Sequence, residues 1–254
     1  MSRLVPAVAR ALDVLELVRF RGASSAPEIT KALGLPRTTV HELIKTLLAR
    51  GYLREAGTAD RYELGIRVLE LGSAYEARLD LAQVAKARAT AVSGECGETV
   101  HVAVLDGTEV VYIVRIESTH VVRMVSAIGG RLPAHVTSVG KALLAYQPKE
   151  RIDELYPPDT ELSVMTPATL KTAGALREAL TQIRADGLAW DACESNPDVY
   201  CVAAPIMDRS GAVVAAMSVS VPAHRWDSDR AAELARLVTG AARDTSRDLG
   251  YPMP

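Results

Sequence analysis

Residues 34–65 read GLPRTTVHELIKTLLARGYLREAGTADRYELG, and this stretch decides the fold of the N-terminal part of the chain. After Pro36, apolar residues recur every three or four positions, which is the period of an amphipathic helix. The predicted buried stripe consists of Val40, Leu43, Ile44, Leu47 and Leu48. Beyond this helix, residues 52–55 and 61–64 have the composition of two short strands joined by a polar turn.

The segment before this helix contains two more predicted helices. Residues 6–20 carry an apolar stripe at helical spacing, and Gly22 ends it. Ser25 and Glu28 then fit a capping box, in which the two side chains satisfy early backbone N–H groups of a second, brief helix. Three helices followed by a hairpin, with a short turn between the second and third, predict a winged helix-turn-helix.

The side of the third helix opposite the apolar stripe is polar. It presents Arg37, Thr38, Thr39, His41 and Lys45. Arginine can form two hydrogen bonds with guanine, and helix-turn-helix proteins place the start of this helix in the major groove of DNA. Arg54 and Arg61 on the hairpin are predicted to reach a neighbouring phosphate or the minor groove. A solvated helix face would explain the third helix alone, but the whole arrangement favours binding of double-stranded DNA.

The distribution of charge agrees with DNA binding by the N-terminal part only. The formal net charge of the whole chain is −2. Residues 1–79 hold 12 Lys and Arg against 9 Asp and Glu, whereas the remainder holds 17 against 22. The N-terminal part is therefore net positive, which is the sign that contact with phosphate requires.

The composition is that of a globular protein, with 48% hydrophobic and 24% charged residues in a chain of 254. That length suits one large or two ordinary domains. No run approaches the roughly 20 apolar residues of a membrane helix, and the N-terminus lacks a signal-peptide pattern. Three cysteines without a CxxC pair indicate a reducing compartment. We therefore expect a cytoplasmic protein without a membrane partner.

The rest of the chain mixes predicted helices with strands. From Ile66 to about Val92 the pattern is helical, with an interruption near Asp80. The strands are predicted at 99–105, 109–116, 199–207 and 212–221, with a further one from Val121 to Ala127. The helices are predicted at 137–146, 171–186 and 227–249. This second part is therefore α+β.

The last two strands place polar groups in an apolar sheet. If the Asp208–Gly211 loop pairs Met207 with Ala212, then Cys201 lies opposite Ser218, and Val199 lies opposite Ser220. These four residues would share one face of a sheet that is covered on both sides. Buried hydroxyls need partners, because an unsatisfied one costs about 1–3 kcal/mol. A ligand carboxylate or carbonyl would satisfy them, and free N–H groups at Ser138, Val139 and Gly140 would assist.

Two other groups of residues are weaker candidates for a catalytic or a metal site. Cys96, His101 and Asp106 could form a nucleophile, base and orienter, but no elbow or oxyanion motif accompanies them. His135 could ligate a metal with Asp191 or Cys201, but a structural hydrogen bond is the simpler expectation. We therefore expect no catalytic residue, no metal and no cofactor. Two alternatives stay open: a small-molecule enzyme that uses Cys201 or Cys96, and a redox sensor in which Cys201 oxidises.

Five blocks of the chain resemble, in order, those of the IclR family of bacterial transcription regulators. They read VARALDVLELV, LGLPRTTVHELIKTLLARGYL, RYELGIRVLELG, LPAHVTSVGKALLA and CVAAPIMDRSGAVVAAMSVSVP. The resemblance implies a winged helix-turn-helix over residues 1–65, a linker helix over 66–80 and a GAF-like effector-binding domain over 81–254. That last domain would have a central, mainly antiparallel sheet flanked by helices.

The same resemblance implies a function and a site. Such regulators bind an operator as homodimers or dimers of dimers, and a small organic acid or similar metabolite alters that binding. In this sequence the matching effector-binding positions are Val121, Met124, Leu132, Ser138, Val139, Asp191, Val199, Cys201, Ser218 and Ser220. Met124 and Leu132 would form an apolar wall and Asp191 a polar rim near the mouth. Leu69, Leu71 and Tyr75 of the linker would help to join two chains.

Overall fold

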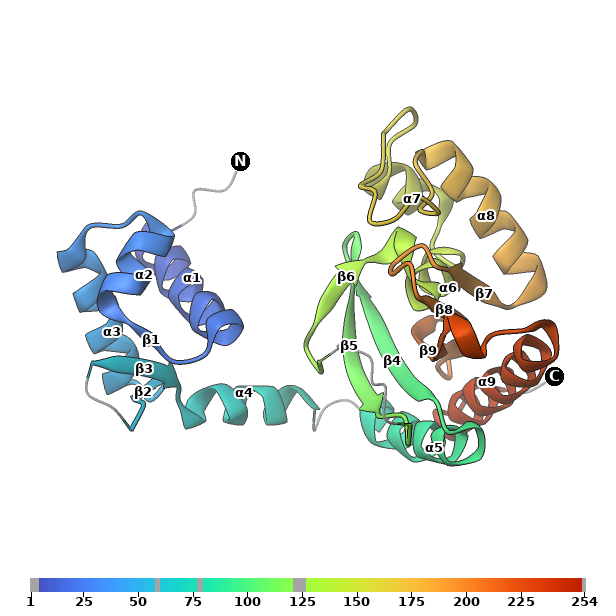
Figure 1. Ribbon diagram of the computed structural model, residues 1–254, viewed down its shortest axis with the longest axis horizontal. Helices are drawn as coiled ribbons and strands as arrows, with labels where there is room; N and C mark the ends of the chain where they lie inside the picture. Colours follow the sequence, from blue (N-terminus) through green and yellow to red (C-terminus); the bar gives the residue numbers. More distant parts are fainter. Residues whose placement is uncertain (1–4, 58–59, 77–79, 121–126, 253–254) are drawn as a thin grey trace. The chain divides into compact units, whose positions relative to one another are not determined.

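The computed structural model describes residues 5–57, 60–76, 80–120 and 127–252 (Figure 1). By its internal contacts the chain divides into two units, Met1–Leu79 and Asp80–Pro254. Each unit is described by itself below. Among the helices that the structure describes, none combines the length and the apolar character that a membrane span requires.

The first unit begins with three helices, α1 (Pro6–Arg21), α2 (Ala26–Leu33) and α3 (Arg37–Ala49). The predicted capping box is confirmed: Ser25 Oγ accepts from the Glu28 N–H, and Glu28 accepts from the Ser25 N–H. Their core comes from the apolar stripes that the periodicity predicts. It contains Val14, Val18, Ile29, Val40, Ile44, Leu47 and Leu53.

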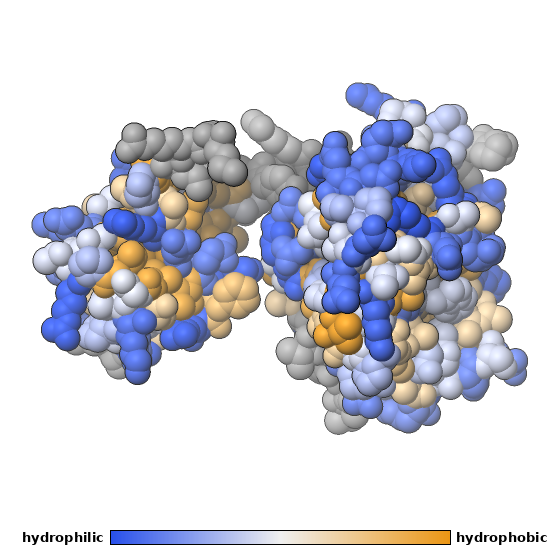
Figure 2. All heavy atoms as spheres, turned by 90° about the horizontal axis from the view of Figure 1, so that it is seen from above, coloured by the Kyte–Doolittle hydropathy of each residue, from blue (hydrophilic) through white to orange (hydrophobic). Residues whose placement is uncertain are grey.

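A small sheet and a fourth helix complete this unit. Strands β2 (Leu53–Glu55) and β3 (Arg61–Leu64) form the predicted antiparallel hairpin. Strand β1 (Ser24–Ser25) adds to the other edge of β3, which the sequence did not predict because two residues carry no alternation. Helix α4 (Ile66–Glu76) follows. Figure 2 shows hydrophobic residues gathered between hydrophilic ones on the visible face of this unit.

The second unit is built on a six-stranded sheet in the order β6-β5-β4-β9-β8-β7. The pairings among the described strands are antiparallel. The strands are β4 (Thr99–Asp106), β5 (Glu109–Ile116), β6 (Arg131–Pro133), β7 (Ala189–Ala192), β8 (Val199–Met207) and β9 (Val213–Pro222). Residues far apart in the sequence therefore meet in the centre, where β4 lies beside β9.

Helices cover both faces of this sheet (Figure 1). On one face lie α5 (Asp80–Cys96) and α9 (Ser228–Asp248). The other carries the short turn η1 and three helices. These are η1 (Ala134–Val136), α6 (Ser138–Leu144), α7 (Lys149–Leu155) and α8 (Ala173–Asp186). A second turn, η2 (Ala223–Arg225), leads from β9 toward α9. The apolar residues of η1, α6, α7 and α8 form one core with Ala103, Ala203 and Ala216 of the sheet.

The short elements are where the sequence prediction was incomplete. Strands β6 and β7 and helix α7 were not predicted, because each is too short to show a period of its own. Most of the predicted strand Val121–Ala127 lies outside the described residues. The fold class itself is confirmed: an N-terminal winged helix-turn-helix precedes an α+β unit with an antiparallel sheet flanked by helices.

Candidate DNA-binding and effector-binding sites

Helix α3 presents a polar side whose residues are accessible. It begins at Arg37, directly after Pro36 as N-cap. Val40, Ile44 and Leu47 are buried. Arg37, Thr38, His41 and Lys45 are exposed, and Thr39 is half-buried. The start of the helix therefore carries a guanidinium, a hydroxyl and an imidazole on the side that faces away from the core of this unit.

The two hairpin arginines differ in what they contact. Arg54 is 69% exposed and forms an ion pair with Glu63 at 2.8 Å. The Arg61 guanidinium donates to the Ala23 carbonyl oxygen at 2.6 and 3.1 Å and pairs with Glu28 at 3.1 Å. Arg61 therefore ties β3 to the start of α2, a role that the sequence analysis did not predict for it. Arg54 keeps the accessibility that a phosphate contact needs.

In the second unit, the predicted polar residues form rows across one face of the sheet. Asp191 of β7 pairs with Cys201 of β8, and Cys201 pairs with Ser220 of β9. In the neighbouring row Ser218 lies between Ala203 and His101. Because directly opposed residues share a face, these side chains form one patch. We call Asp191, Cys201, Ser218, Ser220 and His101 the polar patch.

The predicted pairing of the hairpin was wrong by two residues. Cys201 lies opposite Ser220 rather than Ser218, and Val199 lies opposite Pro222 rather than Ser220. The loop is one residue longer than predicted, because Met207 pairs with Val213 instead of Ala212, and a bulge after that pair adds one more. Two shifts of one residue restore the original face, so the prediction that these side chains lie together holds.

Hydrogen bonds connect the polar patch internally. The Cys201 thiol donates to Ser220 Oγ at 3.2 Å, and Ser220 Oγ lies 3.5 Å from His101 Nδ1. All three side chains are buried. Burial, followed by the charge of Arg115, lowers the pKa of His101 to about 4, so its ring is neutral at neutral pH. The patch therefore offers neutral hydroxyl, thiol and imidazole groups.

The environment of Cys201 keeps its thiol protonated and therefore unreactive. Burial raises the pKa of its thiol well above the ordinary value, and the Asp191 charge raises it further. A nucleophilic or redox-active cysteine needs a lowered pKa and solvent access. The alternative functions that depend on Cys201 therefore find no support in the geometry of the polar patch.

Asp191 does not lie at a polar rim as predicted, because only 1% of its surface is exposed. Its carboxylate accepts from the Glu194 N–H at 2.7 Å, the Ser195 N–H at 3.3 Å and Ser195 Oγ at 2.5 Å. The chain turns back after β7 with Cys193 in the left-handed region (φ 60°), which brings these donors to the carboxylate. Burial raises the pKa of Asp191, and these hydrogen bonds oppose the increase.

The start of α6 lies against the same face of the sheet. Ser138 and Val139, both predicted to bind the effector, are buried there. The Gly140 N–H, however, donates to Thr137 Oγ1 at 3.0 Å, so this predicted anion contact is already occupied. A Cβ on Gly140 would lie 2.1 Å from the Ala134 carbonyl oxygen, which shows how closely η1 and α6 approach each other.

The remaining predicted effector residues divide into two groups. Val199 is buried at the start of β8, and Leu132 is half-buried on β6 beside the core. Val121 and Met124 lie outside the described residues.

Tyr112 of β5 belongs to the same face but was missed by the sequence analysis. Its ring lies 4.9 Å from that of His101, and only 9% of the residue is exposed. Its hydroxyl has no hydrogen-bond partner among the described residues. Burial raises the pKa of Tyr112, and its electrostatic interactions with Cys201 and Asp191 add to the increase. Tyr112 stands in the apolar run of β5, EVVYIVRI, and a tyrosine in such a strand is commonly part of the core, so no signal in the sequence separated it from its neighbours.

The possible catalytic triad and the possible metal site considered from the sequence are not formed by their residues, all of which the structure describes. Asp106 lies five residues beyond His101 on β4, about 16 Å along the strand, and pairs with Arg131. Burial raises the pKa of Cys96. His135 Nε2 lies 2.9 Å from the Ser163 carbonyl oxygen, the structural bond that the sequence analysis favours. Within the described part of the chain, no cluster of three His, Cys, Asp or Glu side chains could hold a metal ion.

The fold and these two groups of residues together define a winged-helix protein whose second unit carries a buried polar patch. Comparisons with known proteins agree. The family model "IclR helix-turn-helix domain" matches residues 7–57, and "Bacterial transcriptional regulator IclR C-terminal" matches residues 73–247. The chain belongs to the IclR family of transcriptional regulators.

Individual relatives cover nearly the whole chain. The HTH-type transcriptional regulator XynR of Escherichia coli is 36% identical over 98% of this chain and 99% of its own. The crystal structure of Thermotoga maritima IclR is 29% identical, with a TM-score of 0.79 over 96% of this chain and 98% of its own. A Microbacterium hydrocarbonoxydans IclR homolog, crystallised with 4-hydroxybenzoate, is 28% identical, with a TM-score of 0.84 over 96% and 98%.

Proposed function

We propose that a small carboxylate binds at the polar patch and changes how α3 engages an operator. The single observation that carries this proposal is the buried row of Cys201 and Ser220 with His101 beside it. Neutral hydrogen-bonding groups inside a sheet are better suited to binding a ligand than to catalysis. The Ser218 and Ser220 hydroxyls would donate to the carboxylate. Val199, Leu132, Val139, Val121 and Met124 would supply the apolar part of the site.

The proposed ligand is an aromatic or short aliphatic acid. The only carboxylate of the polar patch, Asp191, is already engaged by three donors from the following loop. These donors stabilise the Asp191 carboxylate where it lies, so the remaining hydroxyl, thiol and imidazole groups of the polar patch would contact the ligand. The 4-hydroxybenzoate bound to the Microbacterium relative is an acid of this kind. The Tyr112 hydroxyl would contact a second polar group on such a ligand.

In the first unit, α3 would enter the major groove. Arg37, Thr38, Thr39 and His41 would contact bases and nearby phosphates, and Lys45 and Arg54 would contact phosphates only. Arg61 is better explained by its contacts with Ala23 and Glu28. The functional boundaries would run at 1–65 for the DNA-binding part, 66–80 for the linker and 81–254 for the effector part.

The exposed apolar residues of the first unit support assembly into dimers. Val8 and Leu12 on α1, together with Ile66, Leu69 and Leu71 on α4, are more than half exposed. Burial of such residues against a second copy would remove their apolar surface from water. A homodimer, or a dimer of dimers, would place two copies of α3 about 34 Å apart, or a multiple of that distance.

The experiment uses the full chain and the DNA upstream of its own gene. Fluorescence anisotropy measures operator affinity with and without 4-hydroxybenzoate, and a thermal-shift assay measures ligand binding. We expect Ser218→Ala with Ser220→Ala to abolish the ligand response while operator affinity stays the same. The exposed Ser228→Ala is the matched control and keeps the response. If the double variant responds like the parent to every acid that binds, the polar patch is not the effector site.

A further inference from the structure

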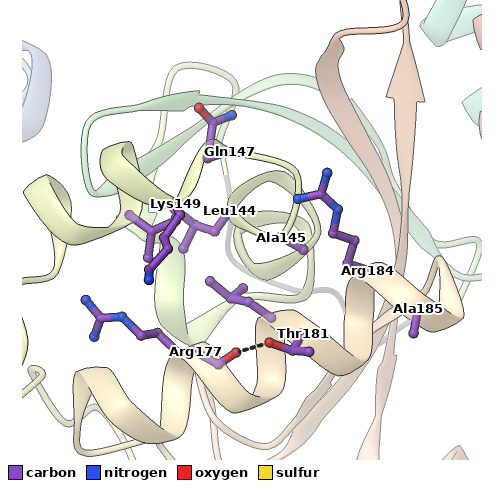
Figure 3. A pocket seen from close by; sticks show the side chains of 10 residues that line it. Leu144, Ala145, Gln147, Lys149, Arg177, Thr181, Arg184 and Ala185 are labelled. Atoms are coloured by element: carbon purple, nitrogen blue, oxygen red, sulfur yellow. Dashed lines mark hydrogen bonds between the residues drawn. The ribbon is translucent and has the colours of Figure 1, made fainter.

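A groove separate from the polar patch lies on the outer side of α6, between α7 and α8 (Figure 3). Its volume is about 480 Å³. Its lining consists of Leu144, Ala145, Gln147, Lys149, Ile152, Arg177, Leu180, Thr181, Arg184 and Ala185. None of these residues belongs to the polar patch, so a ligand here would occupy a different part of the second unit.

The base of the groove is apolar. Leu144 at the end of α6, Ile152 on α7 and Leu180 on α8 are almost fully buried side chains of the core. They line the groove together with Ala145 and Ala185. An apolar part of a ligand would therefore lie on well-packed aliphatic side chains.

The rim of the groove is cationic. Lys149 and Arg184 are exposed and form no ion pair with another described residue. Arg184 lies over the Tyr146 ring, 5.8 Å from its centroid. In Figure 3 the Lys149 and Arg177 side chains extend at the same end of the groove, and Arg184 lies at the other end.

Arg177 is held in place more firmly than its neighbours. Its Nε and Nη2 donate to Asp153 Oδ1 at 3.2 and 2.6 Å, and Nη2 also donates to the Tyr156 carbonyl oxygen at 2.7 Å. Nη1 has no partner among the described residues. This geometry presents one fixed N–H donor group at the end of the groove where Lys149 also lies (Figure 3). Because no acidic residue lines the groove, its charge favours an anion.

We propose that this groove is a second ligand site, specific for amphipathic carboxylates. The carboxylate would lie between Lys149 Nζ and Arg177 Nη1, and an alkyl or aryl body would extend over Leu180 toward Arg184. The volume of about 480 Å³ lies within the range of small-molecule sites, and the cationic rim over an apolar base suits an amphipathic anion. The occupant is therefore a small molecule.

The experiment titrates decanoate into the full chain by isothermal calorimetry, with decanol as the uncharged comparison. We expect saturable decanoate binding, and decanol binding weaker by about tenfold because it lacks the charge-assisted contacts. Lys149→Gln and Lys149→Glu, which remove or reverse the charge at the proposed carboxylate position, should each weaken decanoate binding by about tenfold or more. Arg151→Gln is the matched control, since Arg151 lies on the same helix, pairs with Glu154 and does not line the groove.

Two further variants distinguish this site from the polar patch. Thr181→Trp places a ring in the groove and should abolish decanoate binding, while far-UV circular dichroism checks that the protein stays folded. Ser218→Ala with Ser220→Ala should leave decanoate binding unchanged, even if the proposed effector site is lost. The proposal is overturned if decanoate fails to bind, if the charge variants bind it as the parent does, or if only the serine variants lose it.

Discussion

Lys141 of α6 and Glu194 of the loop after β7 form an ion pair whose side chains are only 5% and 10% exposed. The Glu194 N–H donates to Asp191 at 2.7 Å, so the same residue connects α6 to the polar patch. Glu194 Oε2 is buried and has no hydrogen-bond partner among the described residues. The pair is therefore a charged link inside the apolar core between α6 and the edge strand β7.

Lys141→Met should destabilise the second unit strongly, because it leaves the Glu194 charge buried without a partner. We expect a loss of about 3–5 kcal/mol in the free energy of unfolding. Both tryptophans, Trp190 and Trp226, lie in this unit, so their fluorescence during urea unfolding reports on it. Lys141→Met with Glu194→Leu should recover most of the loss, since an apolar pair fits the site. Equal stability of the single and double variants would contradict this account.

The buried imidazole of His101 should make stability depend on pH. Its folded pKa is about 4, whereas the unfolded value is about 6.5. Above about pH 6.5 both states are neutral and the group contributes nothing. Between about pH 6.5 and 4 only the unfolded chain binds the proton, so stability falls as the pH falls, by roughly 3 kcal/mol in all.

Urea unfolding at several pH values checks this dependence. His101→Gln should unfold with a smaller decrease across that range, because it has no proton to bind. The exposed His224→Gln is the control and should keep the slope of the parent. NMR titration of the His101 ring gives the folded pKa directly, and a value near 6.5 would refute the assignment.

Gly140→Ala should disrupt the contact between η1 and α6. The added Cβ would lie 2.1 Å from the Ala134 carbonyl oxygen, and backbone cannot move aside as a flexible side chain can. We expect a loss of more than about 2 kcal/mol by thermal unfolding. Gly240 in α9 has nothing within 4 Å of its ideal Cβ, so Gly240→Ala should instead stabilise by about 0.5–1 kcal/mol. A neutral Gly140→Ala would show that η1 and α6 are less closely packed.

Arg37→Ala should reduce operator selectivity more than overall DNA affinity. If its guanidinium forms two bonds with a base, the variant loses about 1–3 kcal/mol of discrimination between operator and unrelated DNA. Arg10→Ala removes the same charge from an exposed position on α1 and should leave selectivity unchanged. Anisotropy titrations with operator and scrambled duplexes measure both affinities. Unchanged discrimination in Arg37→Ala would remove that residue from base recognition.

The sequence by itself determined the winged helix-turn-helix and most of the larger strands and helices. The stripe that contains Val40, Ile44 and Leu47 is local in sequence, so its 3.6-residue period is visible without any partner. The capping box of Ser25 and Glu28 is local in the same way. The prediction that Cys201 and Ser220 share a face survived a wrong register, because only an odd shift reverses the faces of a strand.

Only the tertiary structure decided what each polar side chain contacts. Ser220 meets His101 across two strands that lie more than a hundred residues apart in sequence, and no periodicity encodes that distance. The Asp191 carboxylate is hydrogen-bonded by the loop that follows it, and the Arg61 guanidinium is hydrogen-bonded to the Ala23 carbonyl oxygen. Backbone donors and acceptors therefore compete with ligands for these charged side chains. The groove at Lys149 and Arg177 likewise exists only where three helices converge.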